Sequence, residues 1–125
     1  MDLGAILGTP GALTSGRSYH AVLVDTYVLL SDSSKWTQHA HARGAGGEAV
    51  KPTSPDATCW CVLGALARIS NCHGIIDPQL IRYLDAFVEW KYPGAFSNFG
   101  DFNDYYTHPV VMGLLKEAID NMDTK

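Results

Sequence analysis

The spacing of apolar residues along the chain predicts a mainly α-helical fold. Between residues 17 and 31 apolar side chains recur at helical spacing, and the run is longer than a typical strand. The valines in this run favour a strand by propensity, so the segment is ambiguous, and we choose the helix. Apolar stripes also predict a helix from Asp77, with its following proline, to about Trp90, and a last helix that begins after Thr107.

The segment from Cys59 to Leu66 is apolar at almost every position. A helix that is apolar all round is buried on all sides, so this segment is predicted to be the central helix of the fold. Ser54 as an N-cap and Pro55 in the first turn predict where it starts, and it should end near Asn71. Gly64 within it would let a neighbouring segment pack closely.

The region between the first two helices has no helical pattern. Residues 36–43 alternate between small and polar types, and the glycine-rich residues 44–47 follow. Residues 48–51 can return as a second strand, which predicts a small β-hairpin. Residues 95–106 are rich in aromatic residues, Asn and Asp, and are predicted to form a loop. The expected architecture is therefore mainly α with minor β: about four helices around a buried central helix, with the hairpin between helices 1 and 2.

The composition is that of one globular domain. The chain has 125 residues, of which 46% are hydrophobic and 18% are charged. Residues 17–125 are predicted to form the domain, and the glycine-rich residues 1–16 a flexible or docked arm. The net charge of -4 argues against a partner that is a nucleic-acid duplex. We expect no membrane span, because no apolar run is long enough to cross a bilayer. We also expect no secretory signal, because the first residues lack the basic segment of a signal peptide, so the protein is predicted to be cytoplasmic.

A series of short motifs runs through most of the chain in a fixed order: Trp36, Ala42-Arg43-Gly44-Ala45-Gly46-Gly47, Pro52 to Asp56, Trp60-Cys61-Val62-Leu63-Gly64-Ala65-Leu66, Asn103-Asp104 and Thr107. Over about residues 20–120 this order resembles a family of small uncharacterised proteins of bacteria and their phages. Two positions depart from the family pattern, Gly44 in place of an acidic residue and Phe102 in place of tryptophan. The resemblance implies the order of the elements and no activity.

A first candidate ligand site lies in the predicted hairpin. His39, His41 and Arg43 would share one face of a strand, since alternate residues point the same way. Together with backbone N–H groups of residues 44–47 they could contact an anion or phosphate. The alternative interpretation is a solvated hairpin with no ligand.

A second candidate ligand site lies in the predicted aromatic loop. Asn103, Asp104 and Tyr105 stand there among further aromatic residues. Small-molecule pockets combine many apolar side chains with a few polar groups in this way. The alternative is structural, because Asn and Asp side chains also shape turns and cap helices.

The cysteines raise a zinc hypothesis and a nucleophile hypothesis. Cys59, Cys61, Cys72 and His73 are zinc ligand types, and His39 and His41 could add to them, but the spacing is poor. Buried structural thiols are the default, so no cofactor is expected, and zinc is the alternative. As a nucleophile, Cys61 would need a nearby base, and an apolar helix would raise the pKa of its thiol.

The leading functional hypothesis is a non-enzymatic binding or interaction protein, phage-associated, that acts on a host protein or a small ligand. A homodimer is a further alternative for its partner. The predicted interaction surface is aromatic: Trp90, Tyr92, Phe96 and Phe99. The alternative function is a small enzyme or metal-dependent hydrolase that uses His39, His41, Asp104 and Cys61.

Overall fold

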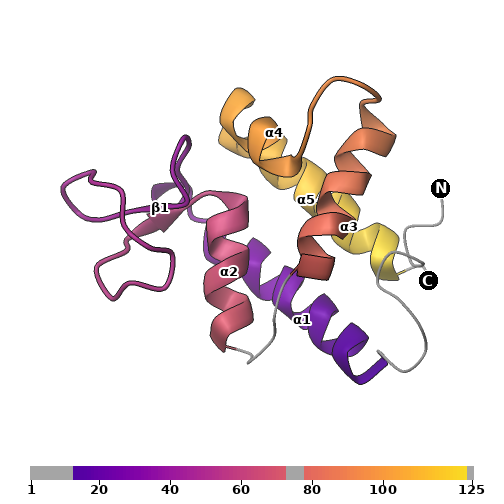
Figure 1. The fold of residues 1–125 in the computed structure, drawn as a ribbon, viewed down its shortest axis with the longest axis horizontal. Coiled ribbons are helices and arrows are strands. Elements are labelled where there is room, and N and C mark those ends of the chain that lie inside the picture. Colours follow the sequence, from indigo (N-terminus) through magenta and orange to yellow (C-terminus); the bar gives the residue numbers. More distant parts are fainter. Residues whose placement is uncertain (1–12, 73–77, 124–125) are drawn as a thin grey trace.

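A computed structural model describes residues 13–72 and 78–123, and Figure 1 shows its arrangement. The described ranges form five α-helices: α1 (Leu13–Leu30), α2 (Val62–Cys72), α3 (Pro78–Lys91), α4 (Phe99–Tyr105) and α5 (His108–Asp123). They also form one 3-10 helix, η3 (Ser33–Lys35), and two short strands, β1 (Ala42–Arg43) and β2 (Cys59–Trp60). The predicted mainly α fold with minor β is confirmed.

The helices bury one common core, and the strands extend from one end of the helical body (Figure 1). Fully buried apolar side chains come from α1, α2, α3 and α5: Val22, Leu23, Leu66, Leu84, Phe87 and Leu115. The hydroxyl of Tyr83 reaches across the core and donates to the carbonyl oxygen of Ala118, at 2.6 Å. None of the described helices combines the length and the apolar character that a membrane crossing requires.

Three of the predicted helices agree with the structure in position. The first begins at Leu13, inside the predicted arm, and residues 1–12 lie outside the described residues. The helix predicted after Asp77 is α3, although Asp77 itself lies outside the described part of the chain. The last helix is α5, and the N–H of Val111 donates to the carbonyl oxygen of Thr107 at 3.0 Å, so Thr107 stands at its N-cap.

The predicted loop over residues 95–106 is wrong in its second half, where α4 forms. The side chain of Asn98 accepts a hydrogen bond from the N–H of Asp101, at 2.8 Å, and caps the helix. Phe99, Phe102 and Asn103 are all buried, which gives this short helix one inward face. Seven residues make too few turns for an apolar stripe to stand out in the sequence.

The predicted start of the central helix is also wrong. Cys59 and Trp60 form β2, which pairs antiparallel with β1, and α2 begins only at Val62. A short apolar run is compatible with a buried strand as well as with a helix, so the sequence pattern did not separate the two. Ser54 closes a turn instead of capping a helix, because its Oγ accepts from the N–H of Asp56 at 3.1 Å.

The predicted hairpin exists, but its main partner differs. Around the glycine turn, Arg43 and Ala49 form only an isolated antiparallel bridge. The two-stranded sheet proper joins Ala42 to Trp60 and Arg43 to Cys59. The segment that leads into α2 therefore replaces residues 48–51 as the principal partner of β1.

The start of α2 packs directly against backbone, and Gly64 makes this possible. A Cβ atom at residue 64 would overlap the carbonyl oxygen of His41, which belongs to the loop before β1. The close packing expected at Gly64 is confirmed. This contact brings His41 and the first turn of α2 together at the edge of the cleft described below.

We predict that Gly64→Ala destabilises the protein strongly, by about 2 kcal/mol or more, because the methyl group meets backbone that has no room to yield. Gly113→Ala is the matched control. Gly113 also lies in a helix, but nothing stands within 4 Å of a Cβ built there, so this change should stabilise the protein by about 0.5–1 kcal/mol. Urea unfolding followed by circular dichroism measures both. Equal stability of the two variants would contradict the packing described here.

Candidate functional site

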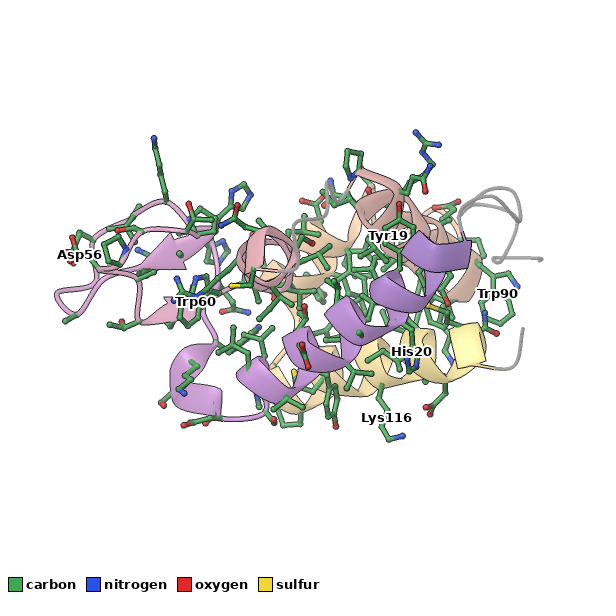
Figure 2. The ribbon with its side chains drawn as sticks, turned by 90° about the horizontal axis from the view of Figure 1, so that it is seen from below. Tyr19, His20, Asp56, Trp60, Trp90 and Lys116 are labelled. Atoms are coloured by element: carbon green, nitrogen blue, oxygen red, sulfur yellow. The ribbon has the colours of Figure 1, made fainter. Side chains whose placement is uncertain are left out.

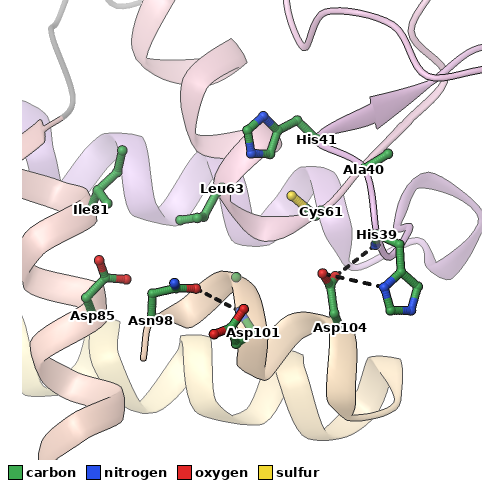
Figure 3. A pocket seen from close by; sticks show the side chains of 11 residues that line it. His39, Ala40, His41, Cys61, Leu63, Ile81, Asp85, Asn98, Asp101 and Asp104 are labelled. Atoms are coloured by element: carbon green, nitrogen blue, oxygen red, sulfur yellow. Dashed lines mark hydrogen bonds and ion pairs between the residues drawn. The ribbon is translucent and has the colours of Figure 1, made fainter. Parts of the chain in front are cut away.

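A cleft of about 770 Å³ opens where the loop before β1 meets α2, α3 and α4 (Figure 3). Its lining residues come from the loop before β1, the start of α2, α3, and α4 with its N-cap: His39, Ala40, His41, Cys61, Leu63, Ile81, Asp85, Asn98, Gly100, Asp101 and Asp104. Of the residues predicted as ligand-binding, His39, His41 and Asp104 therefore come together. The alternative hydrolase residues His39, His41, Asp104 and Cys61 also share this cleft.

His39 and Asp104 form the best-defined contact of the cleft (Figure 3). The Asp104 carboxylate accepts a hydrogen bond from the backbone N–H of His39 at 2.9 Å, and its other oxygen lies 3.7 Å from His39 Nδ1. His39 has φ of 65°, the left-handed region, which costs a residue with a side chain about 1–2 kcal/mol. Backbone strain of this kind concentrates at functional sites. The Asp104 contacts hold His39 in this conformation.

The structure assigns Asn103 a structural role. Its side chain is fully buried, and its Oδ1 accepts from Trp36 Nε1 at 2.8 Å and from the N–H of Val62 at 3.1 Å. Its Nδ2 donates to the carbonyl oxygen of Thr37 at 3.1 Å and to Asp104 Oδ1 at 3.0 Å. An amide side chain has two donor and two acceptor positions, and all are used. Asn103 therefore has no hydrogen-bonding group left for a ligand, so these contacts do not support the prediction that it binds one.

Three carboxylates line the cleft: Asp85 from α3, and Asp101 and Asp104 from α4. Burial raises the pKa of Asp85, a hydrogen bond from the N–H of Phe99 at 2.9 Å opposes this, and the charge of Asp101 raises the pKa further. Among the described residues no lysine or arginine forms an ion pair with any of the three, and none lines the cleft. The cleft therefore carries an excess of negative charge.

Asp85 and Asp101 were not predicted as site residues. Asp85 lies four residues after Ile81, so both are on the same face of a helix, and both line the cleft. A carboxylate at the edge of the apolar stripe of this helix is the sequence feature that could have indicated a site residue. Asp101 gave no signal, because its position depends on α4, and the sequence pattern over residues 95–106 predicts a loop.

Cys61 lies at the floor of the cleft as a neutral thiol. It is buried, and its Sγ accepts from the N–H of Gly64 at 3.3 Å. Burial raises the pKa of the thiol, so little thiolate is present at neutral pH. No group of three or more His, Cys, Asp or Glu side chains within residues 13–72 and 78–123 could hold a metal ion, and His73 lies outside these ranges. The described residues thus do not assemble the zinc ligand set.

Arg43 does not take part in the cleft. Its guanidinium group donates to Thr37 Oγ1 at 3.2 Å, to the carbonyl oxygen of Gly47 at 3.0 Å and to that of Gln38 at 3.1 Å. The strand contains only Ala42 and Arg43, so the predicted strand face shared with the two histidines is wrong. Arg43 instead stabilises this region through these three hydrogen bonds.

The carboxylate of Glu48 occupies the glycine-rich turn of residues 44–47. Glu48 Oε1 accepts from the N–H of Gly46 at 3.1 Å, and the N–H of Gly44 donates to the Glu48 carbonyl oxygen at 2.9 Å. A bound anion would have to displace this side chain. The anion site predicted from the turn is therefore not supported.

The predicted aromatic surface divides into separate parts. Phe99 is fully buried and contributes nothing to a surface, so its assignment is wrong. Trp90 is 47% exposed and lines a shallow hollow with Phe87 and Lys91, at the end of the molecule opposite Trp60 (Figure 2). The remaining two residues, Tyr92 and Phe96, line a different hollow that also includes Tyr105.

Comparison with known proteins identifies one family. A family of unknown function, DUF6197, matches residues 14–121. The chain belongs to DUF6197. The resemblance to a family of small uncharacterised proteins is confirmed, and the DUF6197 match includes every residue that lines the cleft. No curated protein and no solved structure matches the chain. Because DUF6197 is a family of unknown function, membership assigns no activity.

We predict that Asn103→Ala destabilises the protein by about 3 kcal/mol or more, because it leaves the Val62 N–H and Trp36 Nε1 without their acceptor. Asn71→Ala is the matched control, since Asn71 is exposed on α2 and alanine is the better helix former. Chemical denaturation gives both free energies of unfolding. A loss below 1 kcal/mol for Asn103→Ala would contradict the structural role assigned to this amide.

We predict that Asp85→Asn raises the Tm at pH 7 and changes it less at pH 4. The raised pKa means that the folded protein binds the Asp85 proton more tightly than the unfolded chain does, so its stability falls as the pH rises through the folded pKa. Asparagine keeps the acceptor for the Phe99 N–H and carries no charge. Thermal unfolding at both pH values measures the difference.

The control for the Asp85→Asn prediction is the same substitution in a protein that already carries Asp101→Asn. Because the charge of Asp101 contributes to the raised pKa of Asp85, the gain from Asp85→Asn at pH 7 should be smaller there. A Tm that falls in Asp85→Asn at pH 7 would show that the carboxylate stabilises the fold, contrary to the electrostatics described.

Proposed function

We propose that this protein is a non-enzymatic binding protein whose cleft takes a positively charged group, presented by a small ligand or by a basic segment of a partner protein. The observation that carries the proposal is the set of three carboxylates, Asp85, Asp101 and Asp104, in one cleft without a lysine or arginine in its lining.

The electrostatics of the cleft support this ligand class. A concave surface lined by one sign of charge concentrates ligands of the opposite sign. Ammonium and guanidinium groups also form hydrogen bonds to carboxylates that are stronger than neutral ones. The apolar walls at Leu63 and Ile81 would contact the carbon chain of such a ligand. Acid weakens the attraction, because it protonates Asp85, whose pKa burial raises.

The cysteines and the motifs indicate a cellular setting. Three free thiols, Cys59, Cys61 and Cys72, fit a reducing compartment, so we place the protein in the cytoplasm. The resemblance in the motifs supports a phage-associated protein that acts on a host protein. The exposed Trp90 offers a second surface for contact with a protein.

A small hydrolase is the second candidate. The pairing of the His39 imidazole with the Asp104 carboxylate, beside Cys61, supports it, because a base oriented by a carboxylate next to a thiol is the arrangement of covalent catalysis. Burial raises the pKa of Cys61 and leaves the thiol protonated, which makes it a poor nucleophile. Binding therefore ranks first.

The proposal is tested with 1,6-diaminohexane and its neutral counterpart, 1,6-hexanediol. We expect the diamine to shift the amide NMR signals of Gly100, Asp101 and Asp104 at low salt, and the diol to leave them unchanged. The variant Asp85→Asn with Asp101→Asn should weaken diamine binding about tenfold, because it removes two charged acceptors from the cleft.

The matched control is Glu117→Gln with Asp120→Asn, which removes two carboxylates from α5 outside the cleft. It should bind the diamine as the unchanged protein does. Equal shifts with the diamine and the diol, or equal weakening in the two double variants, would overturn the proposed function.

A further inference from the structure

A second hollow, of about 510 Å³, lies beside the cleft and has a different chemistry. Four aromatic side chains line it together with two small residues and one carboxylate: Tyr92, Ala95, Phe96, Ser97, Asp101, Tyr105 and Tyr106. Asp101 belongs to the lining of both hollows and so stands between them.

The aromatic rings of this hollow are held in place by one another and by the core. Phe96 is at the centre, with its ring centroid 6.3 Å from Tyr92, 5.6 Å from Tyr105 and 5.8 Å from Tyr106. Tyr92 stacks on the fully buried Phe102 at 5.6 Å. The rings are therefore already arranged without a ligand, which lowers the ordering cost of binding.

Tyr105 is the unusual member of the set. It is 72% exposed, the most exposed of the large apolar side chains in the described ranges, yet it keeps edge contacts with Phe96 and with Tyr106, whose centroid is 4.8 Å away. The core gains little from a ring in this position. A ring that is fixed at the mouth of a hollow and left open to solvent is instead available to a ligand.

The lining also defines the charge of a suitable ligand. Among the described residues that line it, Asp101 is the one charged member, which makes this lining negative as well as aromatic. The faces of aromatic rings are themselves negative and attract cations that lie within about 6 Å of the ring centre. Both features select a cation, and a weakly hydrated one leaves water for an aromatic surface more easily than a primary ammonium does.

We propose that this hollow is a binding site for a methylated ammonium group, held by Tyr92, Phe96, Tyr105 and Tyr106 with Asp101 as its counter-ion. The site goes beyond the proposed function, because aromatic rings and not a set of carboxylates recognise the ligand. The cation could be a free small molecule or the side chain of a protein.

The first measurement is an NMR titration with choline and with 3,3-dimethyl-1-butanol, its neutral isostere. Choline should shift the ring signals of Tyr105 and Tyr106, and the isostere should not. N-acetyl-trimethyllysine amide is the second probe, and tighter binding of it than of choline would assign the cation to a protein side chain. Equal binding of choline and its isostere would overturn the proposal.

Substitutions test which aromatic rings bind choline. Tyr105→Ala should weaken choline binding about threefold or more, whereas Tyr105→Phe keeps the ring and should keep the affinity. Trp90→Ala is the matched control, because it removes another exposed ring that lines a separate hollow. Weakening by Trp90→Ala equal to that by Tyr105→Ala, or an unchanged affinity in Tyr105→Ala, would also overturn the proposal.

The cleft variant separates this site from the proposed function. Asp85→Asn should leave choline binding unchanged, since Asp85 lines only the cleft, while Asp101→Asn should weaken it. Failure of the diamine to bind with choline binding intact would therefore overturn the cleft proposal alone, and the reverse result would overturn this one.

Discussion

The buried amide of Asn103 is the interaction on which the site depends. It joins the loop at Trp36 and Thr37, the first residue of α2 and the end of α4, which are far apart in the sequence. The contact with the Val62 N–H is buried and those with Trp36 and Thr37 are partly buried, so loss of the amide would leave these groups without a partner at a cost in stability. Because one planar side chain satisfies them together, the three segments have a fixed relative position. The walls of the cleft are the same three segments together with α3, so its geometry follows from this amide.

The same amide also explains the geometry at His39. Asn103 Nδ2 donates to Asp104 Oδ1, and that oxygen accepts the His39 N–H as well. A buried hydrogen-bond network thus continues into a solvent-accessible pair and holds a residue in a conformation that it would not adopt alone. The contacts with Asp104 offset the strain at His39.

Sequence patterns predicted the elements that are long and local, and missed those defined by tertiary contacts. The helices α3 and α5 carry a full apolar stripe, and Thr107 marks the start of the second of them. The pairing of β2 with β1 is set by register across a long loop, and α4 is too short to show a period. The candidate site was therefore predicted only in part. His39 and Asp104 were found as residue types, but their contact and the two further carboxylates depend on where α4 lies.

Several features that stability does not explain lie side by side around Asp101. Three carboxylates share a cleft without a lysine or arginine, and burial already disfavours the charge of Asp85. Beside them Tyr105 exposes its ring to solvent, and Asp101 connects the two hollows. Neither a carboxylate without a cationic partner nor an exposed ring contributes much to folding stability, and function is a recurrent reason why proteins keep features of this kind. Their occurrence together, on a framework that Asn103 joins, supports the proposal that this face binds a cation.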